Sequence, residues 1–369
     1  MPTLHDAVIV RVAGLLHRVV AAIGSLTLRG PRAALAVATA FVVGGAVILA
    51  LILRLQAPYW AGISGFICVQ ASQPQSLRKA LHRMWGTALG AAVALVVFPW
   101  IAYDHAATML VLFVAGTLAI LGSLLSRFSY AWLLGGITTI MVILGALDEP
   151  ALTLSFAFYR SAEITLGSVT ALMIAYMLLP RSGQAVASAP GWGSLFGHNR
   201  HALQHAMRTG AIVALVPLVW RVFELPDLSQ MAISIGAIMA VPELTGDPGR
   251  DQRAITERAA QRVCGCVIGV GAGLLVLTLP WLATLPLWLL CLMLAAAVGS
   301  ELQTGPHAVP MVGTQAVVAF VLTVVQGPGP ALSLLPAIDR AAGMLGALVL
   351  LFVANILLGP QTALAGTPR

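Results

Sequence analysis

The sequence predicts an all-α polytopic membrane protein of about twelve transmembrane helices, arranged as two parallel repeats of six helices each. Of the 369 residues, 59% are hydrophobic and only 9% are charged, whereas soluble domains carry roughly 25% charged residues. So apolar a chain needs lipid as its solvent. An internal repeat and a one-sided distribution of basic residues then predict how the spans are organised.

The repeat is visible in one short pattern. R-x-x-G-x-x-x-G occurs at residues 83–90 and returns, 179 residues later, at 262–269. Arg160 and Arg340 lie 180 residues apart, which is almost the same spacing as that between the two copies of the pattern. A repeat of this length indicates one structural unit written twice.

Twelve apolar runs supply the predicted spans. In the first half they are 33–53, 59–69, 85–103, 106–125, 130–146 and 152–179, and in the second 211–220, 228–241, 263–282, 286–298, 308–325 and 332–358. A full crossing needs about twenty residues. The short runs 59–69 and 228–241 are therefore expected either to cross or to stop at mid-membrane, and short segments at matching places in two repeats are pointers to a transport site.

These runs divide the chain into five parts. They are an N-terminal amphipathic segment (1–31), a first membrane repeat (32–180), a cytoplasmic linker (181–207), a second membrane repeat (208–360) and a C-terminal tail (361–369). The first segment is interrupted by Asp6, Arg11, His17 and Arg18, which makes it a poor signal peptide. An amphipathic helix in the membrane interface is the better interpretation.

Basic residues predict the orientation. If the N-terminus is cytoplasmic and twelve spans alternate, sixteen of the twenty Lys and Arg residues fall on the cytoplasmic side and two on the other. This bias predicts both termini in the cytoplasm. An even number of spans per half makes the repeats parallel. The net charge of +7 then belongs to loops that face anionic lipid, and a nucleic-acid partner is not expected.

Four charges lie inside apolar runs. Arg160 and Glu163 share one helical face because they are three residues apart, and Asp339 and Arg340 hold the matching place in the second half. A charge in the hydrocarbon costs at least ~2.5 kcal/mol. One interpretation is that the arginines bind an anionic substrate while Glu163 or Asp339 exchanges protons. The other is structural ion pairing near the outer interface, with snorkelling arginines.

The remaining polar and glycine patterns are explained by loops, solvated surfaces or helix packing at least as well as by a functional site. The cluster Gln70, Ser72, Gln73 and Gln75 either lines a substrate path or forms a solvated loop. A histidine triplet shares one helical face, but no cysteine or carboxylate lies nearby, so a solvated surface is favoured over a metal site. The three histidines are His198, His201 and His205. The glycines of the repeated pattern indicate close helix packing.

Catalytic motifs are missing from the sequence. It contains no glycine-rich phosphate loop followed by lysine, no H-E-x-x-H, no G-x-S-x-G and no C-x-x-C. Its four cysteines look like packing residues and suggest no disulfide framework. We therefore expect no catalytic site, no metal site and no cofactor, and the chain is not expected to be an enzyme.

At this point the motifs resemble a known family. The succession of Arg32, Pro58-Tyr59-Trp60-Ala61, Gln73-Pro74 and residues 83–90 is similar to the bacterial fusaric acid resistance family of inner-membrane proteins. The second half, with Arg208, residues 239–243 and 262–269, looks like the same unit repeated. Many members carry a sizeable cytoplasmic domain between the halves, where this chain has only residues 181–208.

The resemblance implies proton-driven efflux of aromatic carboxylic acids such as fusaric or hydroxybenzoic acid, together with a periplasmic adaptor and an outer-membrane channel. A small aromatic carboxylate needs a buried arginine and apolar walls. Arg160, Arg340, Trp60 and Tyr159 are therefore the expected substrate-binding residues, with membrane anchoring as the alternative role of the aromatic rings. A homodimer is left open. The rival functions are a passive organic-anion channel and a non-transporting envelope assembly protein.

Overall fold

The computed structural model describes residues 4–27, 29–182, 191–193, 200–223, 228–240, 244–279, 281, 284–327, 329–330 and 335–358. Its first half contains α1 (Leu4–Gly24), α2 (Pro31–Ile52), α3 (Pro58–Cys68), α4 (Gln73–Ile101), α5 (His105–Leu125), α6 (Ser129–Asp148), η1 (Pro150–Leu152) and α7 (Thr153–Leu178). Its second half contains α8 (Arg200–Ala214), α9 (Val216–Phe223), α10 (Leu228–Met239), α11 (Pro248–Leu277), α12 (Leu285–Thr304), α13 (Pro310–Val324), β1 (Val325–Gln326), β2 (Gly329–Pro330) and α14 (Leu335–Leu358). The two short strands pair antiparallel, and the all-α fold is otherwise confirmed.

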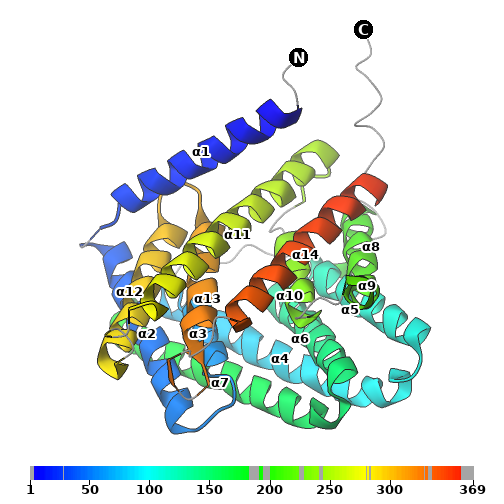
Figure 1. Ribbon diagram of the computed structural model, residues 1–369, viewed down its shortest axis with the longest axis horizontal. Coiled ribbons are helices and arrows are strands. Elements are labelled where there is room, and N and C mark those ends of the chain that lie inside the picture. Colours follow the sequence, from blue (N-terminus) through cyan, green and yellow to red (C-terminus); the bar gives the residue numbers. More distant parts are fainter. Residues whose placement is uncertain are drawn as a thin grey trace. The chain divides into compact units, whose positions relative to one another are not determined.

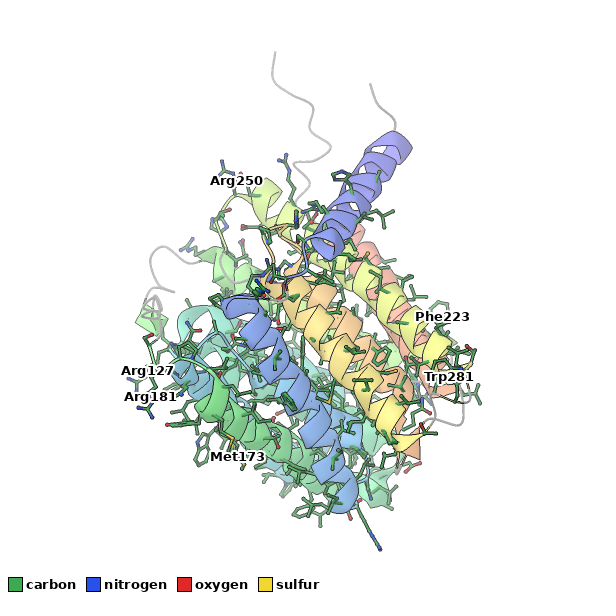
Figure 2. The ribbon with its side chains drawn as sticks, turned by 90° about the vertical axis from the view of Figure 1, so that its left-hand side faces the viewer. Arg127, Met173, Arg181, Phe223, Arg250 and Trp281 are labelled. Carbon is green, nitrogen blue, oxygen red and sulfur yellow. The ribbon has the colours of Figure 1, made fainter. Side chains whose placement is uncertain are left out.

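The helices have the length and surface of membrane spans. Among the described residues, eight helical segments are long and apolar enough to cross a bilayer. Many large apolar side chains point outward, as Met173, Phe223 and Trp281 do in Figure 2, and these three are 56%, 68% and 61% exposed. An outward apolar surface of this kind is suited to lipid. The chain is therefore a polytopic membrane protein.

One predicted span begins much earlier than expected. The apolar run 211–220 is only part of a helical segment that starts at Arg200 and continues, across a break at Leu215, through α9. The first turns of α8 are amphipathic, with Ala202 and Ala206 buried, so a search for continuous apolar residues misses them. Pro217 lies in the first turn of α9, where a missing N–H costs no hydrogen bond.

The described chain forms two compact units. Unit 1 comprises residues 1–84, 158–186 and 257–338, and unit 2 comprises residues 85–157, 187–256 and 339–369. Each unit therefore takes helices from both halves of the sequence. Four of the five boundaries between the units fall within α4, α7, α11 and α14, and the fifth lies between residues 186 and 187.

In unit 1, α2 packs against α3 and α12, and α13 packs against α12 and α3 (Figure 1). Their shared core includes Val47, Phe66, Trp288 and Val321, each at most 2% exposed. The Trp288 indole Nε1 donates a hydrogen bond of 3.0 Å to the carbonyl of Val324, so the largest core side chain has its polar atom satisfied.

Helix α1 packs on the same unit through one face. Leu15, Val19 and Ala22 are buried in a cluster with Leu302 and other residues of the second half. On the other side of α1, Leu16, Val20 and Ile23 are 51%, 68% and 48% exposed. The segment expected to be amphipathic is thus a helix with apolar side chains on both its packed and its exposed faces.

In unit 2, α5 packs against α6 and α8, and α10 packs against α6 and α8 (Figure 1). The side chain of Asp104 caps α5 by accepting hydrogen bonds of 2.9 and 3.0 Å from the amides of Ala106 and Ala107. His205 of α8 makes a 2.8 Å hydrogen bond with the carbonyl of Met239, which ties α8 to the end of α10.

The repeated glycines allow close helix approaches in both units. In unit 2, a Cβ added to Gly90 of α4 would overlap the carbonyl of Gly135 in α6. In unit 1, a Cβ added to Gly269 of α11 would overlap the carbonyl of Ala316 in α13. The glycine four residues earlier in each helix packs in the same way. The predicted packing role of these glycines is confirmed.

Candidate functional site

The candidate site lies in unit 1, where α7 crosses the start of α3. A Cβ added to Gly167 of α7 would overlap the backbone carbonyl of Ala61 in α3, so the two helices touch through their backbones. This contact brings the charged part of α7 beside the first turn of α3. Pro58 begins that turn, because its fixed φ suits the first position of a helix.

Arg160 and Trp60 meet across this junction. The guanidinium carbon of Arg160 lies 3.9 Å from the centre of the Trp60 ring. Arg160 is only 6% exposed. A cation over the face of an indole is stabilised by the ring's electron density, by about 2 kcal/mol when the pair is desolvated. The stack therefore holds a buried positive charge in a fixed position.

Glu163 lies one turn further along α7. Its side chain is almost fully buried, and its Oε1 atom accepts a 2.6 Å hydrogen bond from the backbone amide of Ala57. Ala57 is the N-cap residue of α3, so the carboxylate is held at the positive end of that helix. Arg160 is close enough to act electrostatically on the same carboxylate. The site thus combines a cation, an aromatic face and a carboxylate.

The other predicted site residues are placed differently. Tyr159 lies in α7, directly before Arg160, and is half-buried. Its ring packs edge-on against Phe158 at a centroid distance of 5.9 Å. Asp339 and Arg340 lie in α14, but their side chains are outside the described residues. The structure therefore brings Arg160, Trp60 and Glu163 together, and the roles of the remaining three stay predictions.

The histidine triplet does not form a metal centre in the described part of the chain. His205 bonds to a backbone carbonyl, His201 is exposed, and His198 is outside the described residues. No group of three or more His, Cys, Asp or Glu side chains that could hold a metal occurs among the described residues. The four cysteines are free thiols.

Sequence reasoning did not predict that Arg83, Arg262 and Glu301 are buried charges. Glu301, near the end of α12, is 4% exposed and accepts a 2.7 Å salt bridge from Arg32 at the start of α2. The hydroxyl of Thr27 donates to both of its oxygens, at 3.2 and 3.3 Å. The available signal was an acid at the end of one apolar run and an arginine at the start of another, which does not reveal that the two runs are neighbours.

Comparison with known proteins gives a matching family model and several relatives. Residues 33–190 match the model of the Fusaric acid resistance protein family, which is fewer than half of the 369 residues. The chain is 32% identical over 154 residues to the p-hydroxybenzoic acid efflux pump subunit AaeB of Escherichia coli O9:H4 (strain HS). The proteins of that name from Escherichia coli K12 and Shigella boydii serotype 18 give the same identity.

These matches cover 37% of this chain and 23% of each relative, so the chain spans about a quarter of the length of the curated relatives it matches. No solved structure matches. The matched region contains α2 to α7, and with them the junction of Arg160, Trp60 and Glu163. Residues 33–190 are therefore a membrane segment that is similar to the fusaric acid resistance protein family.

Proposed function

We propose that this protein is an inner-membrane efflux transporter for small aromatic carboxylic acids. The observation that carries the proposal is the buried stack of Arg160 on Trp60, beside Glu163. An aromatic carboxylate offers one negative group and one flat apolar ring, and this junction offers a cation and an indole. The relatives are p-hydroxybenzoic acid efflux pump subunits, and p-hydroxybenzoic acid is a small aromatic carboxylic acid.

Each residue has a distinct role in the proposal. Arg160 binds the substrate carboxylate, and Trp60 and Tyr159 form the wall for its ring. Glu163 takes up and releases a proton, which couples export to the proton gradient. Arg340 and Asp339 supply the corresponding cation and acid in the second half of the chain.

The proposed architecture is twelve spans in two parallel six-helix repeats, with both termini in the cytoplasm. The order of helices supports it, since α2 to α7 correspond one by one to α8–α9 and α10 to α14. The paired contacts support it as well. The approach of Gly90 to Gly135 in unit 2 has a counterpart in the approach of Gly269 to Ala316 in unit 1. A periplasmic adaptor, an outer-membrane channel and a homodimer are the proposed partners.

The test is uptake of labelled 4-hydroxybenzoate into everted membrane vesicles. We expect accumulation against the gradient that collapses with an uncoupler. Arg160→Gln should lower the uptake rate at low substrate at least about tenfold, because a charge-assisted hydrogen bond is worth about 1.5–3 kcal/mol. Arg160→Lys, which keeps the charge, should retain part of the rate. The matched control is Arg181→Gln, since Arg181 is an exposed basic residue just beyond α7 (Figure 2).

Other outcomes would replace the proposal. If the labelled acid only equilibrates across the membrane, and the uncoupler does not change its flux, the protein is a passive anion channel. Uptake that survives Arg160→Gln unchanged would remove Arg160 from the substrate path. A lack of uptake for every aromatic acid tested, with the protein present and folded in the vesicles, would favour a non-transporting envelope protein.

A further inference from the structure

A buried hydroxyl on α3 has no partner in the described part of the chain. The side chain of Ser64 is fully buried, and its Oγ atom makes no hydrogen bond to any described residue. The surroundings are apolar, since Ile63 and Phe66 of the same helix are each 2% exposed and belong to a core cluster of unit 1. A hydroxyl in such surroundings costs free energy unless it finds a partner, so an unsatisfied one needs an explanation.

The ordinary partner of a hydroxyl inside a helix is the carbonyl four residues earlier. The buried Ser168 of α7 uses this partner, because its hydroxyl donates a 2.7 Å hydrogen bond to the carbonyl of Ile164. For Ser64 the corresponding carbonyl belongs to Trp60, and that bond is not made. The Ser64 hydroxyl is therefore available to a group outside the described helices.

The indole of Trp60 adds a second unsatisfied donor on the same face of α3. Its Nε1 atom is buried and likewise has no hydrogen-bond partner among the residues that the structure describes. Because Trp60 and Ser64 are four positions apart, they are neighbours on one helical face, with Cβ atoms about 5–6 Å apart. The Arg160 guanidinium stacks on Trp60 at 3.9 Å. The Ser64 hydroxyl thus lies one helical turn from that stack, towards the middle of α3.

This spacing suits one class of ligand. Four residues of α-helix rise about 6 Å, which is comparable to the length of a benzene ring with one substituent at each end. A ring with a carboxylate at one end and a hydroxyl at the other can therefore reach the cation beside Trp60 and the Ser64 hydroxyl together. A phenolic hydroxyl both donates and accepts hydrogen bonds, so it can pair with a serine hydroxyl in either direction.

We propose that Ser64 is a specificity-determining residue of the transport site and binds the ring hydroxyl of a para-hydroxylated aromatic acid. The inference deepens the transporter proposal and rests on it, since the carboxylate of the same substrate is assigned there to Arg160. The site then selects among aromatic acids by the position of their hydroxyl group. Benzoate has no hydroxyl and leaves Ser64 unpaired. Salicylate carries its hydroxyl beside the carboxylate and cannot place it at Ser64.

The experiment measures equilibrium binding of 4-hydroxybenzoate, benzoate and salicylate, each labelled in turn. The purified full-length protein sits in phosphatidylcholine nanodiscs at neutral pH. All three acids carry one carboxylate and one benzene ring, so they differ in the ring hydroxyl alone. We expect the Kd of 4-hydroxybenzoate to be at least about fivefold lower than that of either other acid, as expected for one net hydrogen bond. Equal Kd values for the three acids would overturn the proposal without any variant.

The variant Ser64→Ala isolates the hydroxyl. It should raise the Kd of 4-hydroxybenzoate at least about fivefold and leave the Kd of benzoate within about twofold. Its melting temperature should be no lower than that of the wild type, because the lost hydroxyl has no described partner and alanine favours the helix. The matched control is Ser168→Ala, since Ser168 is equally buried but already bonds within its own helix. This control should keep the wild-type preference for 4-hydroxybenzoate.

Ordered water is the rival partner of the Ser64 hydroxyl. If water alone bonds to it, folded Ser64→Ala keeps the wild-type order of Kd values, and the proposal fails.

Vesicle uptake separates the two proposals. A preference for 4-hydroxybenzoate that persists in Ser64→Ala removes only the hydroxyl subsite, and Arg160-dependent uptake of the acids still supports the transporter. A Ser64-dependent preference in binding, without uptake of any acid, removes only the transporter. Failure of the folded wild-type protein to bind any of the three acids would overturn both.

Discussion

At the scale of single residues, the described charges in the apolar interior are held by specific partners. Glu301 is the clearest case. Its carboxylate forms a salt bridge with Arg32 and accepts a hydrogen bond from the Thr27 hydroxyl, and the residue is almost fully buried. Removing one member of a buried pair leaves the other with its desolvation cost and without its compensation. Such residues therefore matter for stability chiefly because their removal leaves a buried charge without compensation.

Replacing Glu301 by glutamine should therefore lower the free energy of unfolding by about 1–3 kcal/mol, since Arg32 is left with a neutral partner but is partly exposed to solvent. The measurement is thermal unfolding in detergent micelles. Glu149→Gln is the matched control, because Glu149 is exposed and its neutralisation should leave the melting temperature unchanged. A melting temperature for Glu301→Gln equal to the wild type would show that the ion pair does not stabilise the fold.

The candidate site illustrates which residue contacts a sequence can predict. Arg160 and Glu163 share a helical face because of their spacing, and their position in an apolar run marks them as unusual. Their actual partners, the ring of Trp60 and the amide of Ala57, belong to another helix. That pairing depends on the contact of α7 with α3, which involves residues about a hundred positions apart and leaves no local pattern.

At the scale of helices, the sequence predicts where helices occur better than which of them touch. Local patterns predicted the existence and order of the helices well, including the short α3 and α10, because apolar runs and prolines mark their ends. They placed the start of the span at residue 211 rather than at Arg200, because the amphipathic first turns of α8 do not form an apolar run. The pattern R-x-x-G-x-x-x-G predicted close packing but not the partner, and the structure supplies α6 for α4 and α13 for α11.

Two glycines of α11 provide a matched test. A Cβ at Gly269 would overlap the carbonyl of Ala316, whereas a Cβ at Gly271 would meet nothing within 4 Å. Gly269→Ala should destabilise the protein by about 1–3 kcal/mol through overpacking. Gly271→Ala should be neutral or stabilise it by up to about 1 kcal/mol, because alanine favours the helix. Melting temperatures measured side by side decide the matter, and equal losses in both variants would contradict the packing argument.

At the scale of the whole molecule, the two units each combine segments from both halves of the sequence. Unit 1 needs residues 257–338 to complete the core around α2 and α3, and unit 2 needs residues 187–256 to cover α5 and α6. This exchange could not be predicted from the apolar runs, since the same helix order is compatible with two self-contained halves.

We therefore expect a chain cut in the linker to fold only when both pieces are present. Residues 1–190 or 191–369 expressed alone should be degraded or protease-sensitive in membranes, because each lacks the packing partners of its helices. Co-expression of the two pieces should restore a protease-resistant complex. A stable, protease-resistant product from residues 1–190 alone would mean that the first half folds without the exchanged helices.

The partnership of α2 with α12 also sets a schedule for biosynthesis. Helix α2 ends at Ile52 and α12 begins at Leu285. With synthesis at about 5–20 residues per second, the ribosome needs roughly 10–50 s to deliver the second helix after the first. During that interval Arg32 sits at the membrane without the carboxylate that later neutralises it. Until the late helices arrive, water or the headgroups of anionic lipid at the membrane interface must therefore solvate the Arg32 guanidinium.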